Sequence, residues 1–392
     1  MAVVFPSAKY PKLLRKGTFY TPEQIGEIVD YADERGIVLV PELEGPGHSS
    51  VLRQAYPEVF GKPEYRCIDI SDDKALEAMK TLTEEVIDAF PASPLFHIGA
   101  DEADLSGLQS LPHVAAKIKE KGYEDVHDLY LNYLCEMHGF VKSKGRQTCL
   151  WEGFDKDGSE SVKIPKDVLV FEFETLYQRP DSLAKNGYRM VNTSWEPVYI
   201  TRDRRWLPKD IFDWNYYTWK HWWEKAPASK APIVLDEEVR HLVYGAQMCS
   251  WDMTEESEYP AVCKRLAAMS EKIWNTGTGD YESFSKRIVN SEPKLRKLLY
   301  PFTVTANGLT EPDYEGNDYN RENFFAQQVS LSVKSHLPET VVRYTFDGSF
   351  PAATAAVFPE SLIIDKSTFI KIGVYDSEGI LLSYYPVFYE KK

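Results

Sequence analysis

The alternation of apolar and polar positions predicts strands and helices in turn along the first three quarters of the chain. Thr21, Pro22 and Gln24 form the start of a capping box, and apolar residues then recur at helical spacing up to Arg35. Short apolar runs, separated by helical or irregular segments, indicate six strands at residues 37–43, 95–98, 147–150, 167–173, 188–192 and 243–249. Strands that alternate with helices at this length favour an α/β fold of the (β/α)8 TIM-barrel type.

The number of strands is smaller than a closed barrel needs, because a barrel of this type has eight strands. Residues 1–20 are too few, and too rich in proline and lysine, to hold two strands and their crossover helix. We therefore expect a barrel that lacks its first two strands, with residues 37–43 and 243–249 at its exposed edges. A chain truncated in this way would be weakly active or inactive alone.

The pattern changes after a predicted helix at residues 281–299. Apolar segments at residues 329–333, 341–346, 369–375 and 383–388 are separated by turns such as Asp347-Gly348. Such spacing is typical of an all-β module of the sandwich kind. The sequence therefore predicts two domains, a barrel at residues 1–300 and a β-sandwich module at residues 301–392.

Composition excludes several classes of partner. The formal net charge of −15 argues against binding to the phosphate backbone of nucleic acid. No apolar run is long enough to span a membrane, and the first residues lack the layout of a signal peptide. Five scattered cysteines show no metal-type spacing, so we predict neither a metal nor a cofactor. Nine tryptophans, several just past predicted strands, suggest flat apolar faces of the kind that sugar rings need.

Residues 94–104, PLFHIGADEAD, carry the clearest candidate chemistry. An apolar run typical of a buried strand is followed by Gly99, Ala100 and the adjacent acids Asp101 and Glu102. Barrel enzymes keep their chemistry at the carboxyl ends of the strands, so this pair is a candidate catalytic site. The alternative is that one of the two acids caps the helix that follows. After the first predicted strand, a rigid turn from Glu44 to His48 presents a histidine.

Five segments together resemble glycoside hydrolase family 20, the β-N-acetylhexosaminidases: PELEGPGHSS, FHIGADEAD, CLWEGF, GAQMCSWDM and AAMSEKIW. In the family's His-x-Gly-Gly-Asp-Glu motif, the histidine and the acids match His97, Asp101 and Glu102, and Ala100 replaces the second glycine. VRYTFDGSFP, at residues 342–351, resembles the small β-sandwich often appended to such enzymes. The resemblance covers most of residues 5–299.

This resemblance implies removal of terminal, non-reducing β-linked N-acetylhexosamine (GlcNAc or GalNAc) with retention of configuration. Ordinary retaining glycosidases need two carboxylates about 5–5.5 Å apart on opposite sides of the bond, which adjacent residues cannot easily supply. In the family the substrate's acetamido carbonyl attacks instead and forms an oxazolinium intermediate. Glu102 would protonate the leaving oxygen and later activate water, kept protonated by burial and by the Asp101 charge. Asp101 would accept the acetamide N–H.

Other positions match the family by their order along the chain. Tyr199 falls where a tyrosine hydrogen-bonds the acetamide carbonyl, and Trp151 and Trp251 fall where tryptophans wall the pocket or stack under the sugar. Phe173 stands where a third tryptophan is expected; it has a smaller face and no N–H. For each aromatic residue the alternative is ordinary core packing.

The remaining candidates are polar. Asp252, or else Glu255 or Glu256, takes the place of an acid that binds sugar hydroxyls in the family, while His97 completes the substrate-binding set. Glu44 and His48 would support Glu102 or the sugar, unless His48 is satisfied by the backbone of its turn. The family's sugar-gripping arginine has no counterpart before Ala8.

The predicted partner is a glycan or oligosaccharide with a terminal N-acetylhexosamine, and the oligomeric state is left open. The residues do not indicate a compartment, although the resemblance implies a periplasmic or extracellular one. The alternative function is a non-catalytic or inactive relative that binds glycans through its aromatic cleft. A metal-dependent hydrolase on the same barrel finds little support, because the sequence shows no compact His/Asp ligand set.

Overall fold

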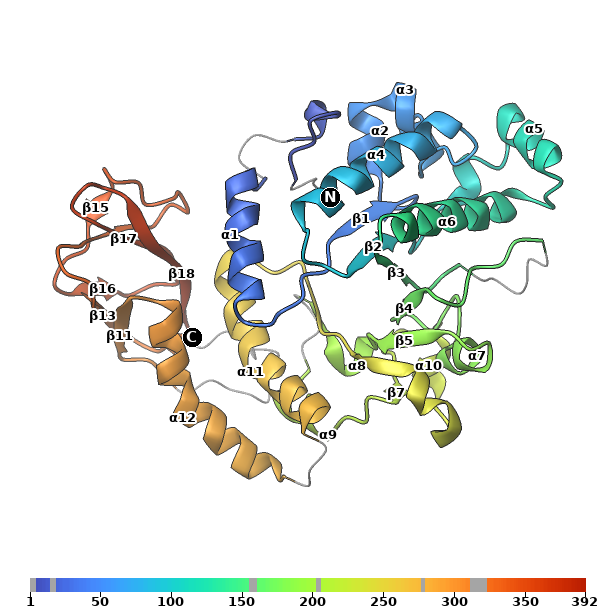
Figure 1. The fold of residues 1–392 in the computed structure, drawn as a ribbon. Helices are drawn as coiled ribbons and strands as arrows, with labels where there is room; N and C mark the ends of the chain where they lie inside the picture. Colours follow the sequence, from blue (N-terminus) through green and yellow to red (C-terminus); the bar gives the residue numbers. More distant parts are fainter. Residues whose placement is uncertain (1–4, 15–18, 155–160, 202–205, 276–278, 311–322) are drawn as a thin grey trace. The chain divides into compact units, whose positions relative to one another are not determined.

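The computed structural model describes residues 5–14, 19–154, 161–201, 206–275, 279–310 and 323–392 (Figure 1). The chain forms two compact units, of which the first comprises residues 1–195 and 216–247 and the second comprises residues 196–215 and 248–392. Because the two units are defined by compactness, they do not test the domain boundary that the sequence predicts between residues 300 and 301. Within the described ranges, no helix combines the length and the apolar character that a bilayer crossing requires.

The first unit is built on a sheet of six parallel strands, as the sequence predicts. In sheet order these strands are β1 (Glu42–Gly45), β2 (Leu95–Gly99), β3 (Gln147–Trp151), β4 (Leu169–Glu172), β5 (Arg189–Asn192) and β9 (Val243–Ala246). Gly45 lies opposite Gly99 in the register, so the segments that follow β1 and β2 emerge side by side. All carboxyl ends of the strands therefore meet along one edge, called here the carboxyl edge.

Helices pack against this sheet. The helices of the first unit are α1 (Pro22–Asp33), α2 (Ser50–Ala55), α3 (Pro57–Phe60), α4 (Asp73–Ala89), α5 (Pro112–Lys121), α6 (Val126–Ser143), α7 (Pro180–Lys185) and α10 (Pro227–Lys230). Helices α1, α4 and α6 begin after the capping residues Thr21, Asp72 and Asp125. The predicted capping box of Thr21 and Gln24 is formed. Helices α4 and α6 lie side by side along β1, β2 and β3 (Figure 1). Their apolar faces bury Leu82 and Leu134 against Phe96 and Ile98 of β2.

The two edge strands differ from the prediction. Pairing in β1 begins only at Glu42, and Ile37 and Val38, which precede it, are each 55% exposed. The strand predicted at residues 243–249 is also wrong at its end. β9 stops at Ala246, and Cys249 instead begins β10 (Cys249–Trp251), which pairs with β6 (Tyr199–Thr201) in a separate two-stranded sheet.

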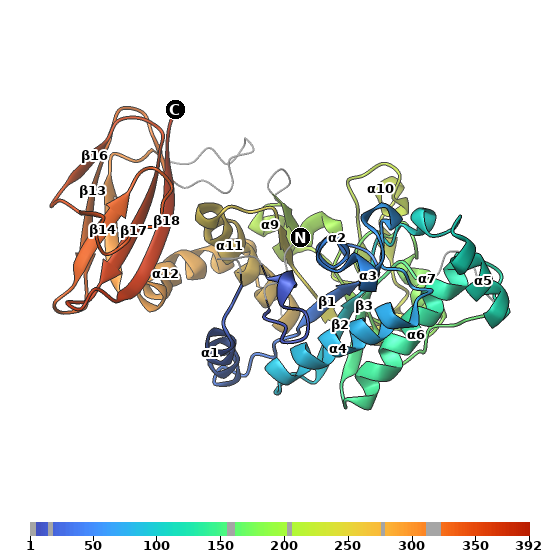
Figure 2. The same ribbon diagram turned by 90° about the horizontal axis from the view of Figure 1, so that it is seen from above.

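The second unit contains the predicted β-sandwich. One sheet has the order β11 (Phe302–Asn307), β13 (Val329–Ser335) and β16 (Leu362–Ile364). The other has the order β12 (Phe324–Phe325), β18 (Leu381–Lys391), β17 (Thr368–Tyr375), β14 (Val341–Thr345) and β15 (Ala356–Val357). Figure 2 shows β18, β17 and β14 side by side. Leu331 and Ile364 of the first sheet and Ile370, Ile372 and Val387 of the second bury one core between them.

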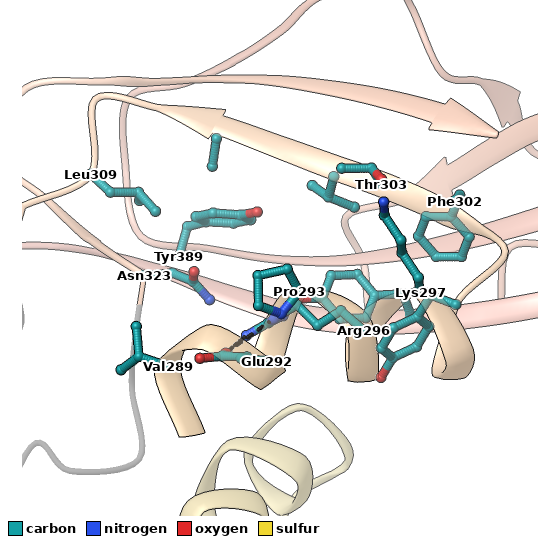
Figure 3. Close-up of a pocket in the computed structure, with 14 residues that line it drawn as sticks. Val289, Glu292, Pro293, Arg296, Lys297, Phe302, Thr303, Leu309, Asn323 and Tyr389 are labelled. Carbon is teal, nitrogen blue, oxygen red and sulfur yellow. Dashed lines mark hydrogen bonds and ion pairs between the residues drawn. The ribbon is translucent and has the colours of Figure 1, made fainter. Parts of the chain in front are cut away.

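The unit also holds α9 (Pro208–Asp213), α11 (Glu255–Trp274) and α12 (Tyr281–Leu299). A cavity of about 490 Å³ lies between α12 and the sandwich (Figure 3). Arg296 and Glu292 form an ion pair on its helical side, with an N···O distance of 2.9 Å.

Candidate active site

The acid pair lies in a tight turn at the end of β2. Ala100 adopts a φ of +91° and Glu102 a φ of +48°, backbone conformations that favour glycine. The Tyr130 hydroxyl donates a 2.6 Å hydrogen bond to the Ala100 carbonyl and holds the turn against α6. The next helical turn, at residues 105–107, is capped by Asp104. Asp101 and Glu102 therefore do not cap this helical turn, and the alternative prediction that one of the two acids is a helix cap is wrong.

His48 lies between the two acids. Its Nε2 atom is 3.3 Å from Asp101 Oδ2 and 3.4 Å from Glu102 Oε2. Hydrogen bonds to both carboxylates raise the pKa of His48 to about 10, so the ring is a cation at neutral pH. A Cβ at Gly47 would lie 2.6 Å from the Asp101 carbonyl oxygen, so only glycine allows the two loops to come this close.

The two acids have different environments. Burial acts to raise the pKa of Asp101, but His48 and Glu44 together bring it below its usual value, so this carboxylate stays ionised. Its Oδ1 atom is buried and accepts no hydrogen bond in the described part of the chain. The expected burial of Glu102 is wrong, because its side chain is 46% exposed.

Glu44 packs beneath this turn. Its Oε1 atom accepts a 3.1 Å hydrogen bond from the Ala100 amide. Burial and the neighbouring Asp101 charge raise the pKa of Glu44 well above its usual range. A Cβ at Gly99 would lie 2.0 Å from a Glu44 oxygen, and the φ of Gly99 is +74°. Glycine at the end of β2 is therefore what lets Glu44 support the acid pair.

Replacing Gly99 with alanine should destabilise the protein more than backbone strain alone does. The matched control is Gly187→Ala, because Gly187 has a φ of +78° and no atom within 4 Å of an added Cβ. We expect the control to cost about 1–2 kcal/mol, and Gly99→Ala to cost a further 1–3 kcal/mol or so from overpacking. Urea unfolding of both variants measures the difference, and equal costs would contradict the proposed contact with Glu44.

A second group joins His97, Trp151 and Phe173. Trp151 Nε1 donates a 2.8 Å hydrogen bond to Glu42 Oε1, and His97 Nδ1 lies 3.2 Å from the same oxygen. Burial acts to raise the pKa of Glu42, but His97 and Trp151 bring it below its usual value. The Trp151 ring centroid lies 5.0 Å from that of His97 and 5.4 Å from that of Phe173. The structure therefore brings these three predicted residues together at the ends of β2, β3 and β4.

Three further acids lie buried at or just past the ends of β3 and β4. Glu152 and Glu172 have no exposed surface, and Glu174 is 8% exposed. Burial raises the pKa of Glu152 to about 8 and that of Glu172 well above its usual range, and the other acids add to both shifts. In the described part of the chain no group of three His, Cys, Asp or Glu residues could hold a metal ion. The raised pKa of Glu152 keeps this carboxyl group protonated at neutral pH, which reduces the charge repulsion in the cluster.

The raised pKa of Glu152 predicts a loss of stability with rising pH. The folded protein keeps a proton that the unfolded chain releases near pH 4.5, so the free energy of unfolding should fall between about pH 4.5 and pH 8. Glu152→Gln should reduce this fall, and Glu58→Gln, at an exposed helical position, should not. Urea unfolding at pH 5 and pH 8 measures the effect, and an unchanged fall in Glu152→Gln would refute it.

Tyr199, Trp251 and Asp252 belong to the second compact unit. Tyr199, on β6, lies opposite Cys249 of the neighbouring strand β10, which ends at Trp251. Tyr199 is 5% exposed and Trp251 is 52% exposed. The predicted convergence of these residues with Trp151 and Phe173 stays a prediction, as do the sugar-binding roles of Asp252, Glu255 and Glu256.

The sequence analysis missed several residues of the carboxyl edge: Glu42, Glu152, Glu172, Glu174 and Tyr177. One signal could have indicated them. An acid near the end of an otherwise apolar run is unusual: Glu42 lies near the end of the strand predicted at residues 37–43, Glu152 directly follows β3 and Glu172 ends β4. Tyr177 packs against Gly153, whose added Cβ would lie 3.7 Å from the tyrosine ring, and no local pattern reveals this contact.

A parallel α/β sheet with acids, histidines and aromatic rings along its carboxyl edge has the layout of a barrel hydrolase. Residues 6–277 match the family described as "Glycosyl hydrolase family 20, catalytic domain". This range is most of the chain, and the protein belongs to that family.

Curated relatives and solved structures agree with this assignment. The chain is 30% identical to a beta-hexosaminidase of Vibrio furnissii over 53% of its own length and 35% of the relative's. It is 26% identical to a beta-hexosaminidase of Porphyromonas gingivalis over 95% of its length and 49% of the relative's. The structure of a Flavobacterium johnsoniae chitobiase matches 76% of this chain and 45% of its own, with 26% identity and a TM-score of 0.61. The chain thus spans half or less of these three proteins.

Proposed function

We propose that this protein removes terminal, non-reducing β-linked N-acetylhexosamine residues from glycans by a retaining, substrate-assisted reaction. The observation that carries the proposal is the adjacency of Asp101 and Glu102 in one turn at the carboxyl edge of a family 20 sheet. Two residues of one turn cannot easily flank a sugar as acid and nucleophile. They suit a reaction in which the substrate's acetamido group attacks and the protein supplies one acid/base and one orienting carboxylate.

The environments of the two acids support different roles. Glu102 is half exposed, so its carboxyl group can reach the leaving oxygen and, afterwards, a water molecule. Asp101 is held ionised beside the His48 cation, so it can accept the acetamide N–H and stabilise the positive charge that develops on that group. Trp151 and Phe173 supply apolar walls, and Tyr199 is the expected donor to the acetamide carbonyl.

Glu102→Gln tests the acid/base role. Because the variant cannot protonate a poor leaving group, kcat/KM on a β-linked GlcNAc disaccharide should fall by about 10²–10⁴. The loss should be smaller on 4-nitrophenyl N-acetyl-β-glucosaminide, whose leaving group needs little protonation. Glu58→Gln is the control and should keep full activity. Equal losses on both substrates would remove Glu102 from this role, and glycan binding without turnover in the wild type would favour the non-catalytic alternative.

Asp101→Ala tests the orienting role. A thiazoline analogue of the cyclic intermediate should inhibit the wild type competitively and bind the variant at least about tenfold more weakly, because a charge-assisted hydrogen bond is lost. Inhibition constants measured with the aryl glycoside give the comparison. Isolation of a covalent glycosyl ester on the wild-type protein would contradict substrate assistance.

A further inference from the structure

The cavity between α12 and the β-sandwich has no role in the reaction proposed above. All of its described lining residues belong to the second unit, so Asp101 and Glu102 contribute nothing to it. Its volume of about 490 Å³ lies within the range of small-molecule sites, which is about 300–1,000 Å³. Strand β11 runs along one side of the cavity and α12 along the other (Figure 3).

Aromatic rings form one wall of this cavity. The ring centroid of Tyr385 lies 5.0 Å from that of Tyr300 and 6.1 Å from that of Phe302. Tyr300 and Phe302 also contact each other, with 5.6 Å between their centroids. The three rings therefore support one another, and together they offer an apolar surface against which the carbon face of a sugar ring can pack.

A buried phenol lines the same cavity. Tyr389 of β18 is only 2% exposed, and Figure 3 shows its ring between β11 and α12. Its hydroxyl forms no hydrogen bond with another residue in the described part of the chain. Burial raises the pKa of Tyr389, so the hydroxyl keeps its proton and can donate it. A buried polar group of this kind calls for a partner from a bound molecule.

Two further polar groups on the wall can accept hydrogen bonds. The Asn323 amide nitrogen donates a 3.4 Å hydrogen bond to the Phe388 carbonyl, which leaves the amide oxygen as an acceptor. Pro293 lies inside α12 and has no N–H, so the Val289 carbonyl one turn earlier lacks its helical donor. Donors and acceptors are thus spread around an apolar space, as recognition of a ring with several hydroxyls requires.

One end of the cavity is positively charged. Lys297 of α12 extends toward Thr303 of β11 (Figure 3). Lys334 lies opposite Thr303 in the antiparallel register, so these two side chains share one face of the sheet. Neither lysine forms an ion pair with another described residue, whereas Glu292 on the cavity wall is already paired with Arg296. In a chain of net charge −15, two such lysines beside one cavity favour an anionic ligand.

We propose that this cavity binds one unit of an acidic saccharide, a sugar that carries a carboxylate or a sulfate. The charged group of the sugar lies beside Lys297 and Lys334, where charge-assisted hydrogen bonds can form. Its hydroxyls bond to Tyr389 and Asn323, and its carbon face packs against the aromatic wall. This second site goes beyond the proposed function and does not depend on it, because its residues lie outside the unit that carries the acid pair.

Both chemical parts of the ligand are needed to satisfy the cavity. A neutral sugar leaves the two lysines without a counter-charge, and a small inorganic anion beside them leaves the Tyr389 hydroxyl without a partner. An acidic sugar supplies an anion at one end and hydroxyl groups at the other.

Three sugars without an acetamido group test the site: methyl β-D-glucuronide, D-glucose 6-sulfate and the neutral methyl β-D-glucoside. The full chain is titrated with each, and ligand-observed NMR gives the Kd. At least one acidic sugar should bind about tenfold or more tightly than the glucoside, because charge-assisted hydrogen bonds are gained. The comparison of the two acidic sugars shows whether the charged group is a carboxylate or a sulfate. Equal affinity for all three sugars, no binding, or equally tight binding of inorganic sulfate would overturn the proposal.

Variants of two lining residues assign the binding to the cavity. Lys297→Gln should remove the preference for the acidic sugar and leave the affinity for the glucoside unchanged. Tyr389→Phe should weaken binding of the acidic sugar about threefold or more through loss of one hydrogen bond, and it should fold, because the hydroxyl that it removes has no partner in the described part of the chain. Lys294→Gln, at an exposed position of the same helix outside the cavity wall, is the matched control. An unchanged preference in Lys297→Gln would refute the site.

Glu102→Gln separates this site from the candidate active site. The variant should bind the acidic sugar as tightly as the wild type does, and a loss of binding would place the sugar at the acid pair and overturn the second site. A wild-type protein that binds the acidic sugar but cleaves neither the GlcNAc disaccharide nor the aryl glycoside would refute the hydrolase and keep the cavity site.

Discussion

The contact between Glu44 and the backbone of Gly99 and Ala100 is the constraint on which the candidate site depends. The Glu44 carboxyl group on β1 lies against the end of β2 and accepts a hydrogen bond from the Ala100 amide, and the lack of a side chain at Gly99 makes room for it. This contact supports the left-handed turn that presents Asp101 and Glu102, and it adds to the ionisation of Asp101. His48 then completes the arrangement from the adjoining loop, which Gly47 allows to approach.

The carboxyl edge carries more acid than base, and the protein compensates for this in three ways. Ionised Asp101 and Glu42 each lie beside a histidine, whereas burial raises the pKa values of Glu44, Glu152 and Glu172. Glu174 accepts a hydrogen bond from the Trp195 indole, and its other oxygen lies 3.3 Å from His221 Nε2. An edge of this kind has fixed partners for its charges before any substrate arrives, which is the preorganisation that electrostatic catalysis requires.

The order of the elements and the position of the acid pair follow from the sequence, because both depend on local patterns: apolar runs, capping residues and the acids that follow a buried strand. The boundaries of β1 and the hydrogen-bond network around Glu42 could not be predicted from the sequence. Trp151 bonds to Glu42 across 109 residues of chain, and a contact of that separation leaves no trace in local periodicity. Strand pairing also depends on contacts between distant parts of the chain. The turn expected at Glu44 is therefore partly strand, and the stretch that ends at Cys249 divides between two sheets.

The two compact units are interleaved along the chain, which passes between them at residues 195/196, 215/216 and 247/248. No single break in the backbone can therefore separate them into two intact pieces. A recombination event that exchanged the sheet-bearing unit for that of a relative would need three matched junctions. Exchanging the whole sheet-bearing unit is therefore harder than gaining or losing strands at the C-terminal end of the chain. The residues of the carboxyl edge are thus expected to change by point substitution rather than by shuffling.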